Sequence, residues 1–78
     1  MIMARKPEHE ISRGLIVARI WRKRSKSGSP FTLSVVRLYR NGDQWKESSR
    51  LSRDDVPLVR HVLDEAHRWI LLREMRTR

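Results

Sequence analysis

Hydrophobic and polar residues alternate through the middle of this 78-residue chain, which is the pattern of half-buried β-strands. Residues 15–23 and 31–40 both alternate in this way, and Gly14 indicates a bend just before the first of them. Asn41-Gly42 then favours a tight hairpin, because both residues tolerate positive φ, and residues 44–51 return antiparallel. We therefore expect an antiparallel sheet of three to four strands.

The first strand separates two sets of side chains. Ile16, Ala18 and Ile20 fall on one side of it, whereas Arg19, Trp21 and Lys23 fall on the other. The alternation becomes irregular at residues 36–38, which is compatible with a bulge and leaves the faces of Arg37 and Tyr39 open.

The spacing of apolar residues changes to that of a helix after Ser52. Ser52 or Asp54 can cap the helix, and Pro57, which is tolerated only in a first turn, favours Asp54. The helix is expected to run to about Arg76. Its apolar stripe is formed by Val59, Val62, Leu63, Ala66 and Ile70, and it is widened by Leu58, Trp69, Leu71 and Leu72.

These elements predict an α+β fold, in which an antiparallel sheet is followed by one long C-terminal helix. Residues 1–10 are polar and are expected to form a flexible tail, and residues 11–78 a single domain. A chain of this length has a thin core and usually needs an additional stabilising element. Because it has no cysteine, we expect that element to be a second subunit, in a homodimer. The apolar residues assigned to the dimer interface are Val62, Ala66, Trp69 and Ile70.

The net charge of +9 is concentrated in the sheet. Residues 11–53 contain eleven Lys or Arg against two Asp or Glu, which accounts for the whole excess. Arginine-rich composition alone would explain a high total, since 14 of the 18 basic residues are Arg, but it would not explain this uneven placement. One cationic layer on a neutral support is typical of a surface that binds a polyanion.

Several classes of function are not expected. The three histidines are spread along the chain and no phosphate-binding glycine loop is present, so we expect no metal, cofactor, small-molecule substrate or enzymatic activity. No apolar run approaches the ~20 residues of a membrane span, and the first residues lack a signal peptide, so we expect a cytoplasmic protein without membrane contact.

The candidate binding surface combines basic strand positions, a basic loop and aromatic rings. Cations hold the backbone of a single-stranded nucleic acid, and aromatic rings stack on its bases. Trp21, between Arg19 and Lys23, meets both needs; Trp45 and Tyr39 could stack on bases or pack against the helix. The predicted nucleic-acid-binding residues are Arg19, Trp21, Arg22, Lys23, Lys26, Arg37, Tyr39, Arg40, Lys46 and Arg50. The alternative is that these are ordinary solvated positions.

The order of strand, basic loop, strand, tight turn, strand and capped helix resembles the transcriptional-coactivator-type (whirly-like) single-stranded DNA-binding family. The resemblance covers roughly residues 11–72. It implies a curved antiparallel sheet followed by one helix, and a homodimer whose helices pack between the subunits. By position, Arg19, Trp21 and Lys23 match the family's first binding strand, Arg37, Tyr39 and Arg40 its second, and Lys46 and Arg50 its third. The chain is also similar to short bacterial proteins of unassigned function that share the Ile20-Trp21 and Trp45-Lys46 pairs.

Together these observations predict a homodimer that binds single-stranded DNA or RNA with little sequence preference. One alternative is a protein-interaction module that uses the C-terminal helix, with the charge serving solubility. Another is a double-stranded DNA binder that inserts an element into a groove.

Overall fold

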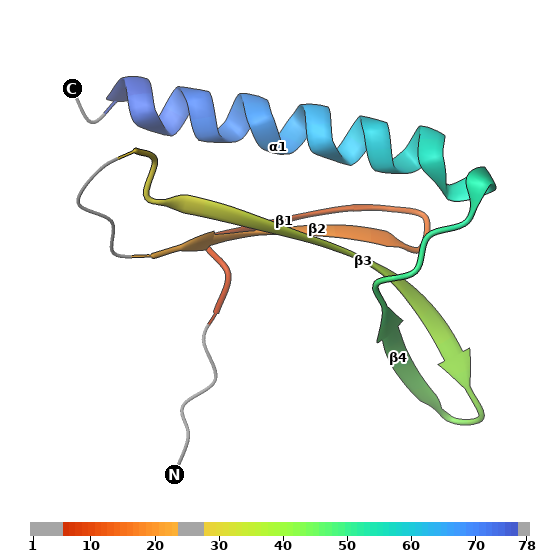
Figure 1. The fold of residues 1–78 in the computed structure, drawn as a ribbon. Coiled ribbons are helices and arrows are strands. Elements are labelled where there is room, and N and C mark those ends of the chain that lie inside the picture. Colours follow the sequence, from red (N-terminus) through yellow and green to blue (C-terminus); the bar gives the residue numbers. More distant parts are fainter. Residues whose placement is uncertain (1–5, 24–27, 77–78) are drawn as a thin grey trace, which may run out of the picture.

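A single antiparallel sheet lies beneath one long helix in the computed structural model, which describes residues 6–23 and 28–76 (Figure 1). The strands are β1 (His9–Arg13), β2 (Ile16–Arg22), β3 (Phe31–Asn41) and β4 (Gln44–Ser48), and they pair in sequence order. A short 3₁₀ turn, η1 (Arg53–Asp55), leads into α1 (Val56–Arg76). The predicted α+β fold, a sheet of up to four strands followed by one C-terminal helix, is confirmed.

A separate strand, β1, precedes the bend at Gly14. His9 and Glu10 belong to β1, and the backbone N–H of Glu8 donates to the carbonyl of Ile20. The predicted tail over residues 1–10 is therefore two residues too long at least. Gly14, with φ of 59°, opens the two-residue turn between β1 and β2, so the predicted bend is a tight hairpin.

The second hairpin also differs from its prediction by one residue. Asn41 pairs with Gln44, so the two central residues of the turn are Gly42 and Asp43. Gly42 has φ of 64°, and no other residue type among those described adopts positive φ. A glycine at the first central position is typical of a type II′ turn.

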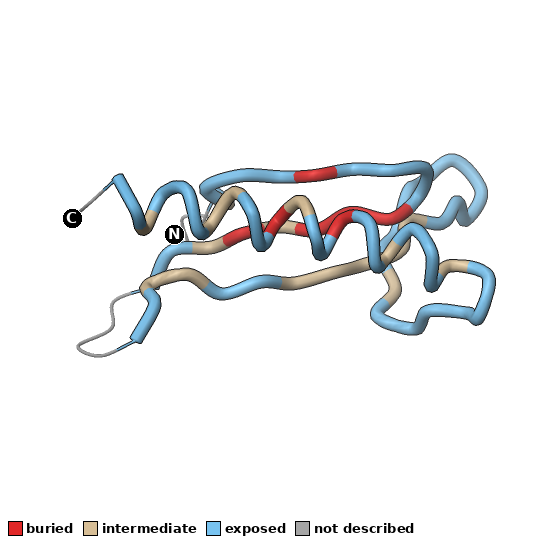
Figure 2. The backbone as a smooth tube through the Cα atoms, turned by 90° about the horizontal axis from the view of Figure 1, so that it is seen from above, coloured by how far each residue is buried: buried red, intermediate tan, exposed pale blue. Residues whose placement is uncertain are grey.

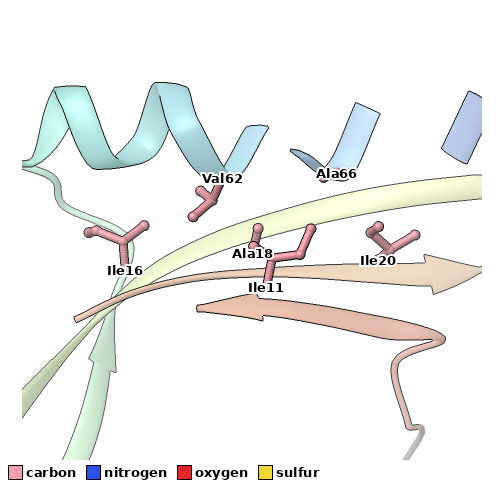
Figure 3. Packing of buried hydrophobic residues seen from close by; sticks show 6 residues of the cluster. All are labelled: Ile11, Ile16, Ala18, Ile20, Val62 and Ala66. Carbon is pink, nitrogen blue, oxygen red and sulfur yellow. The ribbon is translucent and has the colours of Figure 1, made fainter. Parts of the chain in front are cut away.

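The core lies between α1 and the two strands beneath it, β1 and β2 (Figure 2). Side chains from the three elements meet there, and all six are aliphatic and buried (Figure 3). The cluster consists of Ile11, Ile16, Ala18, Ile20, Val62 and Ala66. The predicted apolar side of the first strand is thereby confirmed.

Two residues assigned to a dimer interface belong to this core instead. Val62 and Ala66 are both 0% exposed within one chain, so they have no surface left for a second subunit. Trp69 packs against the sheet of its own chain, stacked on His9 with ring centroids 5.0 Å apart and edge-on to Phe31 at 5.5 Å. The assignment of these positions is corrected because the sheet takes up the centre of the apolar stripe.

The start of the helix is held by Ser52 and Asp55. The backbone N–H and the hydroxyl of Ser52 both donate to Oδ2 of Asp55, at 2.8 and 3.0 Å. The prediction that Asp54 caps the helix is wrong, because a 3₁₀ turn precedes α1 and still leaves Pro57 in the first α-helical turn. α1 itself is too polar to cross a bilayer, and none of the described helices could do so.

Candidate nucleic-acid interface

One face of the sheet is left uncovered by the described elements. α1 lies over one side, and no other described element lies over the opposite side (Figure 1). Directly opposed residues of an antiparallel pair share a face, so the register identifies the side chains there. We call this surface the open face; it carries Glu10, Ser12, Val17, Arg19, Trp21, Thr32, Ser34, Val36, Leu38, Arg40, Trp45 and Glu47.

Arg19 lies on the open face, but its charge is already matched. Its Nε donates to Oε2 of Glu10 on β1 at 2.7 Å, and its Nη2 donates to Oε2 of Glu47 on β4. The side chain is only 20% exposed. The two carboxylates hold the pKa of Arg19 further above its ordinary value, and the guanidinium in turn lowers the pKa of Glu47. Arg19, one of the predicted phosphate contacts, is thus held in an ion-pair cluster.

Trp21 also lies on the open face, as predicted, at the end of β2. It is partly buried, and its indole Nε1–H donates to the hydroxyl of Ser34 on β3 at 2.9 Å. Because a hydrogen bond fixes the edge of the ring, the indole is held in one orientation against the sheet. A ring fixed in this way loses little conformational entropy when it stacks on a ligand.

A second aromatic residue stands at the other end of the same face. Trp45 is 57% exposed and lies directly opposite Arg40 in the β3–β4 pair. The Arg40 guanidinium carbon is 5.9 Å from the centroid of the indole, within reach of a cation–π interaction. Trp45 was not among the predicted site residues. The sequence left open whether Trp45 stacks on bases or packs against the helix, and the structure leaves it exposed on the open face.

Four predicted residues occupy the opposite face. Arg37 pairs opposite Ile16, without a bulge, and its Nε lies 3.3 Å from Oδ1 of Asp55. Arg22 lies over the Phe31 ring at 4.8 Å. Tyr39 and Lys46 oppose each other on this same side, and both are exposed. The structure thus divides the predicted site between two faces of the sheet.

The remaining predicted residues lie outside the strands. Lys23 is exposed just after β2, where its N–H donates to the carbonyl of Pro30. Arg50 is exposed just after β4, and its N–H donates to the hydroxyl of Ser48. Lys26 lies outside the described residues.

The open face is therefore not uniformly basic. Glu10 and Glu47 both pair with Arg19, Arg40 lies beside the Trp45 ring, and the aromatic rings lie at the two ends. Within the described ranges, 6–23 and 28–76, no three His, Asp or Glu side chains gather in a way that could hold a metal ion.

Comparison of the chain with protein-family models, with curated proteins and with solved structures gave no match.

Proposed function

We propose that the chain binds single-stranded DNA or RNA on the open face, with little sequence preference. The observation that carries this proposal is an uncovered sheet face with an indole near each end, Trp21 and Trp45, and a guanidinium beside the second. Every base has a π face, so stacking on these rings tolerates any sequence. No reaction is implied.

Stacking also favours unpaired strands over a duplex. The bases of a duplex already stack on one another, and their π faces are not available to a protein without unstacking. The indoles on the sheet can therefore stack on the bases of a single strand without the free-energy cost of unstacking a duplex. The net charge of +9 supplies the attraction to a phosphate backbone of either kind.

A homodimer is part of the proposal. β3 extends past the cover of α1, so some apolar side chains on the helix side remain accessible (Figure 2). Leu33, opposite Ile20, is 39% exposed, and Leu63 on α1 is 37% exposed. Covering these side chains with a second copy would remove apolar surface that a thin single-chain core leaves in water.

The β3–β4 ribbon supports a second candidate function. It projects beyond the end of the sheet and carries Arg40 and Lys46 on its two sides (Figure 1). A two-stranded ribbon fits the major groove of duplex DNA. This candidate requires tighter binding to duplex than to single strands, which the first candidate does not allow.

A gel-shift series distinguishes the two functions. The chain is titrated against the same sequence as single-stranded DNA, duplex DNA and single-stranded RNA, at two salt concentrations. We expect the single strands to shift at lower protein concentration than the duplex, with similar affinity for unrelated sequences. Preference for the duplex would transfer support to the groove-binding candidate, and no shift in any lane would contradict both.

A further inference from the structure

We infer that Trp45 and Arg40 form a base-stacking site separate from Trp21, and that one bound nucleic-acid strand, running along β3, spans both sites. This inference rests on the proposed function and deepens it, because it assigns a path and a minimum length to the bound strand.

The side chains at the hairpin end are arranged for a ligand rather than for the core. Trp45 keeps 57% of its surface exposed, although a ring of this size is usually covered in a folded domain. Arg40 is held beside it, since its Nε donates to the carbonyl of Gly42 at 3.1 Å. One indole face and one oriented guanidinium thus stand together at the turn.

The charge of Arg40 is available for a phosphate. No carboxylate of the described residues forms an ion pair with it, whereas Arg19 on the same face is held by two. A base stacked on Trp45 would place its own phosphate within reach of the neighbouring guanidinium. The hairpin end therefore offers a ring for the base and, for the phosphate, a guanidinium that no carboxylate of the described residues pairs with. The guanidinium of Arg19 is already paired.

The two indoles are joined by a continuous path on β3. Trp21 is opposite Thr32, and Trp45 is opposite Arg40, eight residues further along the same strand. At about 3.3 Å per residue this corresponds to roughly 26 Å along the strand, and to less in a straight line because β3 bends. Ser34, Val36 and Leu38 lie between them on the open face.

This separation sets the length of the ligand. A strand with the ~3.4 Å rise of stacked nucleotides needs about eight nucleotides to cover the path, and an extended strand needs fewer. The Arg19 cluster, one cation with two carboxylates, carries a net negative charge, so phosphate contacts concentrate at the two ends. A tetranucleotide then reaches one indole, and a dodecanucleotide reaches both.

The test is fluorescence anisotropy with labelled oligothymidylates of four and twelve nucleotides. The proteins are the wild type, Trp21→Ala, Trp45→Ala and, as a matched control, Leu72→Ala, which removes another exposed apolar side chain from the far end of α1. Circular dichroism confirms that each variant is folded. Trp45→Phe, which keeps an aromatic face, serves as a second variant and should retain most of the affinity.

For the dodecamer, Trp45→Ala and Trp21→Ala should each weaken binding by about 5–150-fold, the range expected for one lost stack. For the tetramer each loss should be much smaller, because the other indole still accepts it. Leu72→Ala should match the wild type with both lengths.

Each other outcome overturns the inference. If Trp45→Ala leaves the affinity for the dodecamer unchanged, there is no stacking site at the hairpin. If a Trp→Ala variant loses as much affinity for the tetramer as for the dodecamer, one oligomer does not bridge the two indoles. Both outcomes leave the proposed function intact so long as the wild type binds. If the wild type binds neither oligomer, the proposed function itself fails.

Discussion

Arg19 donates a hydrogen bond to Glu47, although their strands, β2 and β4, are separated by β3. The guanidinium reaches across the intervening strand, while its Nε holds Glu10 on the other side. One cation thus connects three strands of the open face. Both carboxylates are about half exposed, so each ion pair contributes at most about 1 kcal/mol to stability, and the cluster determines which charges a ligand meets.

Release of Arg19 should strengthen nucleic-acid binding. In a Glu10→Gln, Glu47→Gln double variant the guanidinium has no carboxylate partner and can contact a phosphate. One additional contact to a single strand should steepen the log–log salt dependence by about 0.7. Anisotropy across a salt series measures this slope. An Asp54→Asn, Asp64→Asn variant removes the same charge elsewhere, and if it changes the slope equally, the effect belongs to net charge and not to Arg19.

Acid should destabilise the protein through two carboxylates. Hydrogen bonds from Arg19 lower the pKa of Glu47 below its ordinary value of 4.5, and those from Ser52, with the charge of Arg37, lower the pKa of Asp55 below 3.8. A lowered folded-state pKa stabilises the fold at higher pH, and this stability is lost as the pH falls through that pKa. The melting temperature should therefore fall between about pH 5 and pH 2.

Asp55→Asn provides the check on that assignment. The variant should melt lower than the wild type at pH 7, because Ser52 loses a charged acceptor at the start of the helix, and the gap should narrow at pH 2.5. Thermal melts followed by circular dichroism at the two pH values give both quantities. A gap that stays constant would show that ionisation of Asp55 does not stabilise the fold.

The core should be sensitive to the loss of a single methyl group. Ile20 is 0% exposed between the sheet and α1, so Ile20→Val should lower the free energy of unfolding by about 0.5–1.5 kcal/mol. Leu72→Ala removes more carbon from a side chain that is 62% exposed, and it should change stability by less than about 0.5 kcal/mol. Urea denaturation compares the two. A larger effect of Leu72→Ala would mean that a second copy covers the end of α1.

The exposed apolar side chains of Leu33 on β3 and Leu63 on α1 predict that the chain forms a dimer. Sedimentation equilibrium at micromolar concentration should give twice the chain mass of 9.4 kDa. Leu33→Lys combined with Leu63→Lys should give the single-chain mass, since both charges would be placed in the contact surface. Leu72→Lys is the control for the added charge. A wild type of single-chain mass would contradict the dimer.

The alternation of residues 15–23 was sufficient to predict which side of β2 enters the core, because Ile16, Ala18 and Ile20 share a parity and bury together. The bend at Gly14 allowed a strand before it, but the bounds of β1 could not be predicted, since Ile11 is its only buried residue and five residues carry too little pattern. The faces of β3 followed only from its register, which places Arg37 opposite Ile16.

The site was harder to predict than the fold, for a related reason. Charge counts along the sequence treat Arg19 as an available cation, but its pairing with Glu47 depends on the shape of the sheet across three strands. The exposure of Trp45 likewise depends on its register, which places it opposite Arg40 on the face that α1 does not cover. Both relationships join residues on different strands, so the alternation within any single strand does not show them.

The three indole N–H signals of a ¹H–¹⁵N correlation spectrum test the central claim most directly, with each signal assigned by a Trp→Phe variant. On addition of a single-stranded dodecamer, the signals of Trp21 and Trp45 should shift, because both rings lie on the open face. The signal of Trp69 should stay in place, because that ring lies on the helix side of the sheet, packed against His9 and Phe31. Shifts at Trp69 alone, or at none of the three when the oligomer is in excess, would contradict binding at the open face.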